Sequence, residues 1–237
     1  MPQHISRREL KKDEVRATLA HGAEAVLSHQ QIVLYIVILA VVVALGVFGW
    51  RSYLQRQTDK ASVAFDSALK VFQAPVGAPA APGGLAYPDA NKKFTEAEQK
   101  FAEVASKFQR VRPGQLARYY AALSLEQLGK DNDARKWLEG LVGNKDEDIA
   151  ALAQFQLALI ADRTGQGDEA VKLYRRLLDK PTAMVPKPTI LLALAQHYSE
   201  KDPAQAAKLY GEIKSEYPDT PSAEEAERAL ALLPGSS

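Results

Sequence analysis

The second half of the chain repeats itself, and this internal similarity constrains the fold more than any other feature. Three similar segments begin at Tyr119, Phe155 and Leu191, so the period is 36 residues. Aligned positions carry a small residue, then large apolar residues in the following two turns. These sets are Ala134, Ala170 and Ala206; Trp137, Leu173 and Leu209; Leu138, Tyr174 and Tyr210; and Leu141, Leu177 and Ile213. One helix pair of this kind cannot bury its apolar face alone, so the pattern predicts stacked helix pairs.

Each repeat is predicted to contain two helices joined by a short turn. Gly129 and Gly165 fall at this turn in the first two copies, and Lys201 takes the place of glycine in the third. A partial copy, FTEAEQKFAEV, lies about one period earlier. The closing segment AEEAERALALL is predicted to form a helix that caps the open end of the stack.

This pattern resembles the tetratricopeptide repeat over about residues 92 to 220. The resemblance rests on a small residue in the first helix, glycine at the turn, alanine opening the second helix, an aromatic residue four positions later and a terminal proline. The residues that carry it are Ala122 and Ala158; Gly129 and Gly165; Ala134, Ala170 and Ala206; Tyr174 and Tyr210; and Pro218. The resemblance implies an all-α fold, an α-solenoid of tetratricopeptide-type helix pairs. The loops between repeats would absorb the two residues by which the period exceeds the usual 34.

In this family the first helix of each pair lines the concave face, so the resemblance also implies a groove that binds an extended or helical peptide. The protein-binding residues placed there are Tyr119, Leu123, Glu126, Gln127, Phe155, Leu159, Asp162, Arg163 and Tyr198, with Leu152, Leu191 and Ala195 at equivalent positions. Leu152, Phe155 and Leu191 have two interpretations, because they either contact a ligand or pack under the neighbouring helix. Tyr119, Tyr198, Asp162 and Arg163 are the residues expected to make exposed contacts.

A run of 19 uncharged residues, IVLYIVILAVVVALGVFGW, extends from Ile32 to Trp50. As a helix it would be roughly 28 Å long, close to the ~30 Å hydrocarbon core of a bilayer. Tyr35 and Trp50 lie near its ends, where aromatic rings favour the membrane interface. A cleaved signal peptide is the alternative, but such peptides have apolar runs of ~7–15 residues, and no A-x-A cleavage site follows. The sequence therefore predicts a transmembrane helix over 31–51, with residues 32–50 in contact with lipid.

A leader of residues 1–30 precedes the span. Ser6 and Glu9 match a capping box there, and helical spacing of apolar residues follows, which predicts a short amphipathic helix. This helix is either a docking element on the near side of the membrane or a solvated cap. Basic residues flank the span almost equally on its two sides, so charge favours a cytoplasmic N-terminus only slightly.

Residues 52–91 form a predicted connector between the span and the repeats. The span helix is expected to continue to about Gln73, because no helix breaker interrupts it. The segment APVGAPAAPGG, residues 74–84, then predicts a loop. Residues 92–237 are predicted to form the tetratricopeptide repeat domain with its C-terminal capping helix.

Chemical function has little support in the sequence. The chain has no cysteine, which excludes disulfides, thiolate catalysis and cysteine metal sites. A net charge of +1 argues against nucleic acid as a partner. The four histidines show no metal-ligand spacing, and phosphate-loop, dinucleotide and hydrolase motifs are absent. We therefore expect no enzyme, no catalytic residue, no metal, no cofactor and no small-molecule substrate; His197 is expected to have a structural role, and Asp146, Glu147 and Asp148 to head a helix.

The layout of leader, single span and translocated repeats resembles a bacterial family of ancillary Sec translocon subunits. That resemblance implies a non-enzymatic adaptor at the bacterial inner membrane, with a cytoplasmic N-terminus and a periplasmic repeat domain that binds emerging chains or chaperones. The alternative is a structural scaffold that holds an envelope or division complex together through fixed protein partners.

Overall fold

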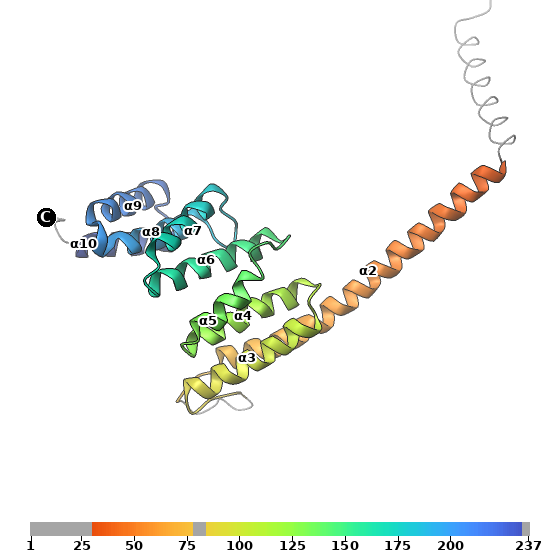
Figure 1. Cartoon of the computed structure of the whole chain (residues 1–237), viewed down its shortest axis with the longest axis horizontal. Coiled ribbons are helices and arrows are strands. Elements are labelled where there is room, and N and C mark those ends of the chain that lie inside the picture. Colours follow the sequence, from red (N-terminus) through yellow and green to blue (C-terminus); the bar gives the residue numbers. More distant parts are fainter. Residues whose placement is uncertain (1–29, 78–83, 234–237) are drawn as a thin grey trace, which may run out of the picture. The chain divides into compact units, whose positions relative to one another are not determined.

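The structure, a computed structural model, describes residues 30–77 and 84–233, and regular secondary structure in these ranges is α-helical (Figure 1). The helices are α2 (Gln30–Gln73), α3 (Ala90–Lys107), α4 (Arg112–Gln127), α5 (Asp131–Glu139), α6 (Glu147–Arg163), α7 (Gly167–Asp179), α8 (Lys187–Lys201), α9 (Pro203–Glu216) and α10 (Pro221–Leu232). The predicted all-α fold class is confirmed. The expected amphipathic helix of the leader, with Ser6 and Glu9, lies outside the described residues.

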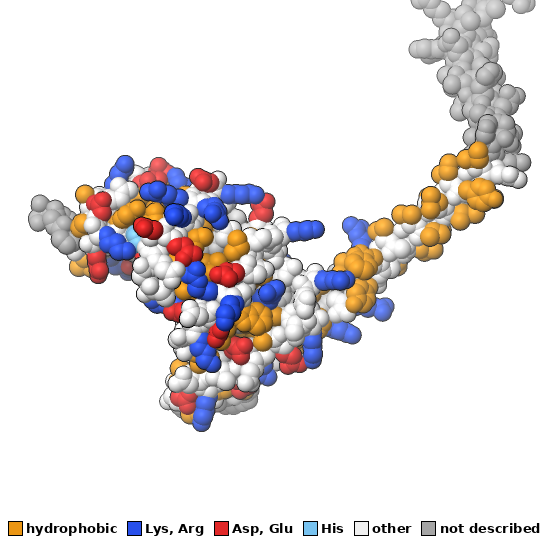
Figure 2. Space-filling model, in the orientation of Figure 1, with side chains coloured by type: hydrophobic (Ala, Val, Ile, Leu, Met, Phe, Trp, Pro, Cys, Tyr) orange, Lys and Arg blue, Asp and Glu red, His pale blue; other side chains and the backbone are white. Residues whose placement is uncertain are grey.

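Helix α2 continues to Gln73, as the absence of a helix breaker predicted. The chain divides into two compact units, Met1–Arg56 and Gln57–Ser237, and α2 contributes to both. As far as Trp50, the described large apolar side chains of the first unit are exposed, for example Ile32 at 55% and Trp50 at 54% (Figure 2). This helix is the one described helix that is long and apolar enough to cross a membrane, with a mean hydropathy of 2.2 in its most apolar stretch.

The second unit begins with a helix pair that the sequence pattern did not predict. Phe65 and Phe72, on the last turns of α2, place their rings 5.5 Å and 6.1 Å from the ring of Phe101 on α3. Tyr120 of α4 joins the same cluster, stacked on Phe101 at 5.2 Å and edge-on to Phe65 and Phe72 at 5.4 Å and 5.5 Å. The packed unit therefore starts well before residue 92, because aromatic side chains of the connector helix cover the apolar face of α3.

The in-phase positions of the repeats form the core, and they extend into α3. The alanines in the first turn of α5, α7 and α9, and the equivalent Ala97 within α3, are completely buried. The large apolar residues four and seven positions after each alanine are also buried, with at most 4% of their surface exposed. These sets are Ala97, Ala134, Ala170 and Ala206; Phe101, Leu138, Tyr174 and Tyr210; and Val104, Leu141, Leu177 and Ile213. Burying one such large side chain stabilises the fold by about 1.5–3 kcal/mol. Helix α10 packs on α8 and α9 and covers the last pair, as its sequence predicted.

The turns inside the first two predicted repeats need glycine. Gly129 and Gly165 have φ values of 69° and 78°, in the left-handed region that side chains disfavour. The following amides close each helix: Lys130 N donates to Leu125 O at 2.9 Å, and Gln166 N donates to Ala161 O at 2.7 Å. The third repeat has no such residue, because Asp202 ends α8 and its carboxylate accepts from Gln205 N at the start of α9.

Candidate protein-binding surface

The predicted binding residues lie on the first helices of three successive pairs. Helix α4 contacts α6, and α6 contacts α8, so the three helices present neighbouring faces. Tyr119, Leu123, Glu126 and Gln127 come from α4; Leu152, Phe155, Leu159, Asp162 and Arg163 from α6; and Leu191, Ala195 and Tyr198 from α8.

The apolar residues on α8 are packed in the core, whereas those on α6 remain partly accessible. Leu191 and Ala195 are buried in the core, at 2% and 0% exposure, so they support the fold and are not contact residues. Leu152, Phe155 and Leu159 are half-buried at the edge of the same core. These three side chains keep part of their apolar surface available to a ligand.

Tyr119 was expected to be an exposed contact, and the structure places most of it inside. Its ring packs against the core between α4, α5 and α6, and its hydroxyl lies 3.5 Å from Gln156 Oε1 on α6. Burial is the largest cause that raises the pKa of the Tyr119 hydroxyl above its ordinary value of 10.0, and the Glu126 carboxylate adds to it. Tyr119 therefore helps to join two repeats and is only partly exposed.

Glu126 is the centre of a polar network between α4 and α6. Its side chain is only 6% exposed, and its Oε2 accepts from Gln156 Nε2 at 2.9 Å and from Arg163 at 3.1 Å. Arg163 also pairs with Asp131 at the start of α5, at 2.7 Å. Burial raises the pKa of the Glu126 carboxyl above its usual value, although the hydrogen bonds from Gln156 and Arg163 oppose this shift. Glu126 and Arg163 thus have partners within the chain, which the sequence did not reveal.

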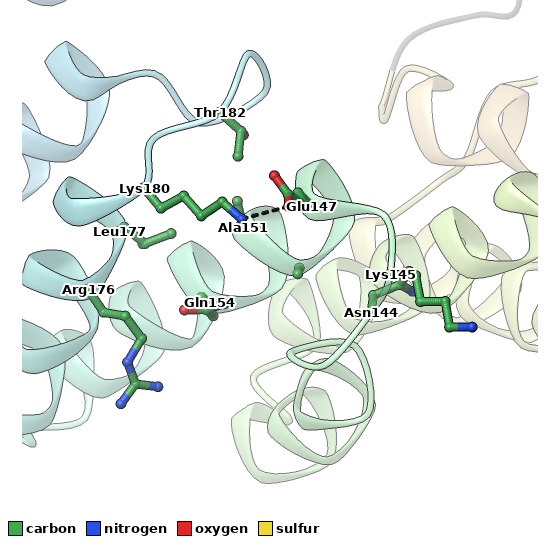
Figure 3. Close-up of a pocket in the computed structure, with 10 residues that line it drawn as sticks. Asn144, Lys145, Glu147, Ala151, Gln154, Arg176, Leu177, Lys180 and Thr182 are labelled. Atoms are coloured by element: carbon green, nitrogen blue, oxygen red, sulfur yellow. Dashed lines mark hydrogen bonds and ion pairs between the residues drawn. The ribbon is translucent and has the colours of Figure 1, made fainter.

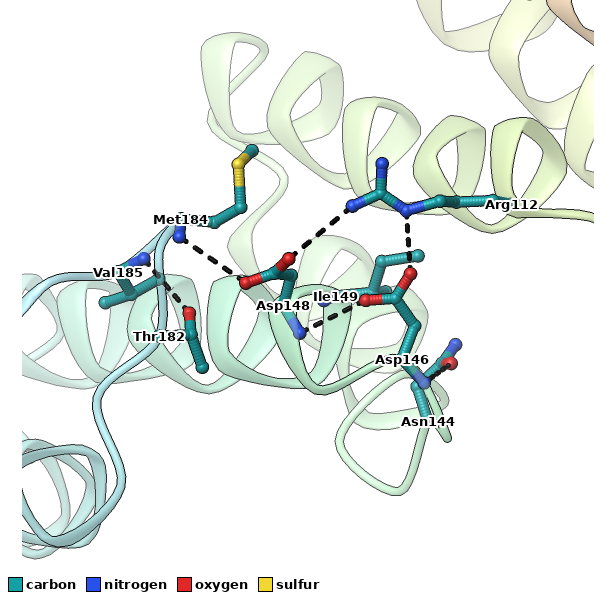
Figure 4. Close-up of polar contacts among 8 residues, drawn as sticks. All are labelled: Arg112, Asn144, Asp146, Asp148, Ile149, Thr182, Met184 and Val185. Carbon is teal, nitrogen blue, oxygen red and sulfur yellow. Dashed lines mark hydrogen bonds and ion pairs between the residues drawn. The ribbon is translucent and has the colours of Figure 1, made fainter.

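A second polar link joins the opposite ends of α4 and α6 (Figure 4). Arg112 at the start of α4 donates to Asp146 at 2.7 Å and lies 3.7 Å from Asp148. Asp146 also caps α6 by accepting from the backbone N–H groups of Asp148 and Ile149. The hydrogen bond from Arg112 is the main cause that lowers the pKa of Asp146. These acidic residues head a helix, as expected, and Arg112 is the partner that sequence reasoning missed.

Asp162 makes a polar contact from α6 to α8. Its Oδ1 lies 2.5 Å from Nδ1 of the buried His197. This contact fits the structural role expected for His197 and turns Asp162 inward. Within residues 30–77 and 84–233, no group of three histidine, aspartate or glutamate side chains could hold a metal ion.

What stays available on α4, α6 and α8 is a half-exposed apolar row with polar neighbours, which we call the first-helix face. Gln127 is exposed, Tyr198 is half-buried, and the Arg163 side chain keeps half of its surface in solvent. The first-helix face consists of Leu123, Gln127, Leu152, Phe155, Leu159, Arg163 and Tyr198. Such a surface offers dispersion contacts and a few hydrogen bonds, which suits a peptide or a helix.

The structure also contains a pocket of about 470 Å³ that the sequence pattern did not indicate (Figure 3). It lies between the start of α6 and the end of α7. Lys180 reaches across it to Glu147 at 2.6 Å, and Ala151 and Leu177 form part of its wall. The residues come from segments about 30 positions apart, so their meeting depends on how the two helices pack.

Two family models match the chain. A model described as tetratricopeptide repeat-like domain matches residues 28–181, and a tetratricopeptide repeat model matches residues 190–220. Neither a curated protein nor a solved structure matches the chain. The two matches together cover most of α2 to α9, including the three helices that carry the first-helix face.

Proposed function

Because the chain belongs to the tetratricopeptide repeat-like domain family, we propose that it is a membrane-anchored, non-enzymatic adaptor that holds protein partners on the first-helix face. Repeats of this family are protein-interaction modules. The observation that carries the proposal is the row of half-buried apolar residues on α4 and α6, Leu123, Leu152, Phe155 and Leu159. Burying the rest of that row under a partner would remove more apolar area from water, at about 25 cal/mol per Å².

The membrane anchor is the α2 segment from Ile32 to Trp50. Its described large apolar side chains are exposed, among them Leu34, Leu39, Leu45 and Phe48, which is costly in water and favourable in hydrocarbon. The ring centroids of Trp50 and Tyr53 are 6.2 Å apart, and Arg51 lies between these residues in the sequence. Two aromatic residues and a cation suit the interface between lipid and water.

We also propose where the chain is located in the cell and which complex it binds. We place the chain in the bacterial inner membrane, with its N-terminus in the cytoplasm and its repeats in the periplasm beside the Sec translocon. The support is the resemblance in layout, a leader, one span and a repeat domain, to ancillary subunits of that translocon. A reporter enzyme fused after Ser237 should be active only outside the cytoplasm, and activity confined to the cytoplasm would overturn this placement.

Site-specific photo-crosslinking in membranes tests the binding face itself. A photoreactive residue at Gln127 or Phe155 should capture proteins, because both positions lie on the first-helix face. The matched control is Lys136 on α5, whose side chain is 74% exposed but lies on a second helix. Equal capture at Lys136 and Gln127 would contradict a binding role for this face.

The identity of the captured proteins separates the adaptor from the scaffold. Translocon subunits, chaperones or nascent chains are expected for an adaptor. One stoichiometric partner from an envelope or division complex, with nothing else captured, would instead support a structural scaffold.

A further inference from the structure

A second pocket, of about 620 Å³, lies where the start of α7 meets the end of α8. Helix α8 contributes Tyr198 and Lys201 to its lining. Helix α7 contributes Asp168, Val171, Lys172 and Arg175. Tyr198 also belongs to the first-helix face. A ligand that lies along that face can therefore extend into this pocket.

The three cations of the pocket differ from the other cations between repeats. Arg112 and Arg163 each pair with a carboxylate of the neighbouring repeat, at 2.7 Å. Arg135 also pairs across a repeat boundary, with Glu169 at 2.9 Å. In the described ranges, by contrast, no ion pair involves Lys172, Arg175 or Lys201. Asp168 is the one carboxylate that lines the pocket, so two positive charges remain uncompensated.

The pocket also has an apolar wall, formed by the Tyr198 ring and Val171. The Tyr198 ring stands edge-on to the buried His197 ring, with centroids 5.1 Å apart. Asp162 in turn holds His197, so the Tyr198 ring has a supported orientation. Val171 is half-buried beside it. An apolar or aromatic side chain of a ligand would find a preformed wall here.

We propose that this pocket binds an acidic segment of a partner protein, in which carboxylates pair with Lys172, Arg175 and Lys201 and a neighbouring apolar side chain packs on Tyr198 and Val171. Charge complementarity selects the ligand. Nucleic acid fits less well, because three cations and a carboxylate in one pocket do not provide the track of about 6–10 phosphate contacts that such binding uses. Figure 2 shows acidic side chains interleaved with basic ones over the α7 to α9 surface, which also argues against such a track.

This inference rests on the proposed adaptor role and names the chemistry of the partner. Arginine and lysine differ in how they would contribute: Arg175 can pair with a carboxylate through two parallel hydrogen bonds, whereas the two lysines act as point charges. We therefore expect Arg175 to contribute most to the choice of carboxylate over amide.

The test uses the full chain in neutral detergent micelles and a defined probe. The probe is a short fluorescent peptide with glutamates on both sides of a phenylalanine, and its counterpart has glutamines in their place. The acidic peptide should bind and the glutamine peptide should not. Binding should weaken as salt rises from about 0.1 M to 1 M, because the Debye length falls from about 10 Å to about 3 Å.

Two adjacent arginines provide a matched pair of variants. Arg175 lines this pocket, whereas Arg176 lines the other pocket, between α6 and α7, so the two differ in position but not in charge. Arg175→Gln should lower the affinity for the acidic peptide about three-fold, and Arg175→Gln with Lys172→Gln about ten-fold. Arg176→Gln should leave it unchanged. Equal losses from Arg175→Gln and Arg176→Gln, or equal binding of both peptides, would overturn the inference.

Three further outcomes distinguish this inference from related proposals. Binding of short-chain phosphatidylglycerol to the wild-type protein that Arg175→Gln weakens, combined with no measurable affinity for the acidic peptide, would identify a lipid headgroup site and overturn the inference. Capture of partners at Gln127 with no binding of the acidic peptide would overturn this inference but not the proposed adaptor function. Peptide binding with no capture at Gln127 or Phe155 would leave the pocket intact and overturn the proposed adaptor function.

Discussion

Glu126 on α4 and Arg163 on α6 are 37 residues apart in the sequence, and an ion pair of 3.1 Å joins them across a repeat boundary. The glutamate is almost fully buried, whereas half of the arginine side chain faces solvent. The pair therefore links two repeats at the rim of the core. Arg112 with Asp146 makes a similar link at the other end of the same two helices.

Arg163→Gln should destabilise the repeat unit. The substitution leaves Glu126 with Gln156 as its hydrogen-bond donor, and a lost hydrogen bond to a buried charge costs about 1–2 kcal/mol when water can partly replace it. Urea unfolding of the full chain in detergent, followed by helical circular dichroism, measures the effect. Arg176→Gln, at an exposed position without an ion pair in the described residues, is the control and should change nothing. The double variant Glu126→Gln with Arg163→Gln should lose less than Arg163→Gln alone.

Glu126 should also make stability depend on pH in a particular direction. Burial raises the pKa of its carboxyl in the folded state, so the folded chain binds a proton more readily than the unfolded chain. The Glu126 carboxyl therefore lowers the free energy of unfolding as pH rises from 4.5, its ordinary pKa, towards its raised pKa in the folded state. Glu126→Gln removes that dependence, so the melting temperature of the variant relative to the wild type should increase with pH over this range.

Asp133 provides the comparison of opposite sign. The hydrogen bond from Lys136 lowers the pKa of Asp133, so its contribution is present above its ordinary value of 3.8 and is lost as pH falls through the lowered folded value. Asp133→Asn should therefore become less stable relative to the wild type as pH rises. A Glu126→Gln variant with the same trend as Asp133→Asn would contradict the burial of the Glu126 carboxylate.

Gly114→Ala should disturb the start of α4. A Cβ at this position would lie 1.9 Å from the carbonyl oxygen of Phe108, so the backbone must shift, at a cost of about 1–3 kcal/mol. Gly143→Ala is the matched control, since a Cβ there would meet nothing within 4 Å. Thermal unfolding of the two variants checks the difference, and equal melting temperatures would show that α4 does not approach Phe108 so closely.

Val43→Arg should impair membrane insertion. Val43 lies in the middle of the proposed span, where an arginine costs about 2.5–3.5 kcal/mol on an insertion scale. Val63→Arg places the same residue later on the same helix, at a side chain that is 73% exposed in the repeat unit, and should be tolerated. Extraction of membranes with alkali distinguishes the two variants. Release of neither, or of both, would argue against a span limited to residues 32–50.

The core of the repeats could be predicted from the sequence because its signal is periodic. Ala134, Ala170 and Ala206 stand in phase, and all three are completely buried. The turn glycines were also visible, since few other residues adopt a positive φ. The pairing of α2 with α3 was not visible, because Phe65 and Phe72 lie outside the repeated pattern and contact Phe101 only through tertiary packing.

The candidate surface was harder to predict than the core. The repeat pattern placed Leu123, Phe155 and Leu159 on first helices, and in the structure all three are half-buried there, while their role as contacts stays a prediction. It did not indicate that Asp162 would contact His197. A polar residue on a helix face looks the same in a sequence whether its partner is water, a ligand or a side chain 30 positions away. The two pockets were missed for the same reason, since each combines residues of two helices.

The polar links between α4 and α6 also have a geometric consequence. Apolar packing alone tolerates small rotations of one helix pair against the next, whereas two charged contacts at opposite ends of the same helices set the angle between them. In a stack, any change in that angle is repeated in the position of every later pair. Arg112 and Arg163 therefore help to set the bend of the first-helix face between α4 and α6, and so the path that a ligand follows there.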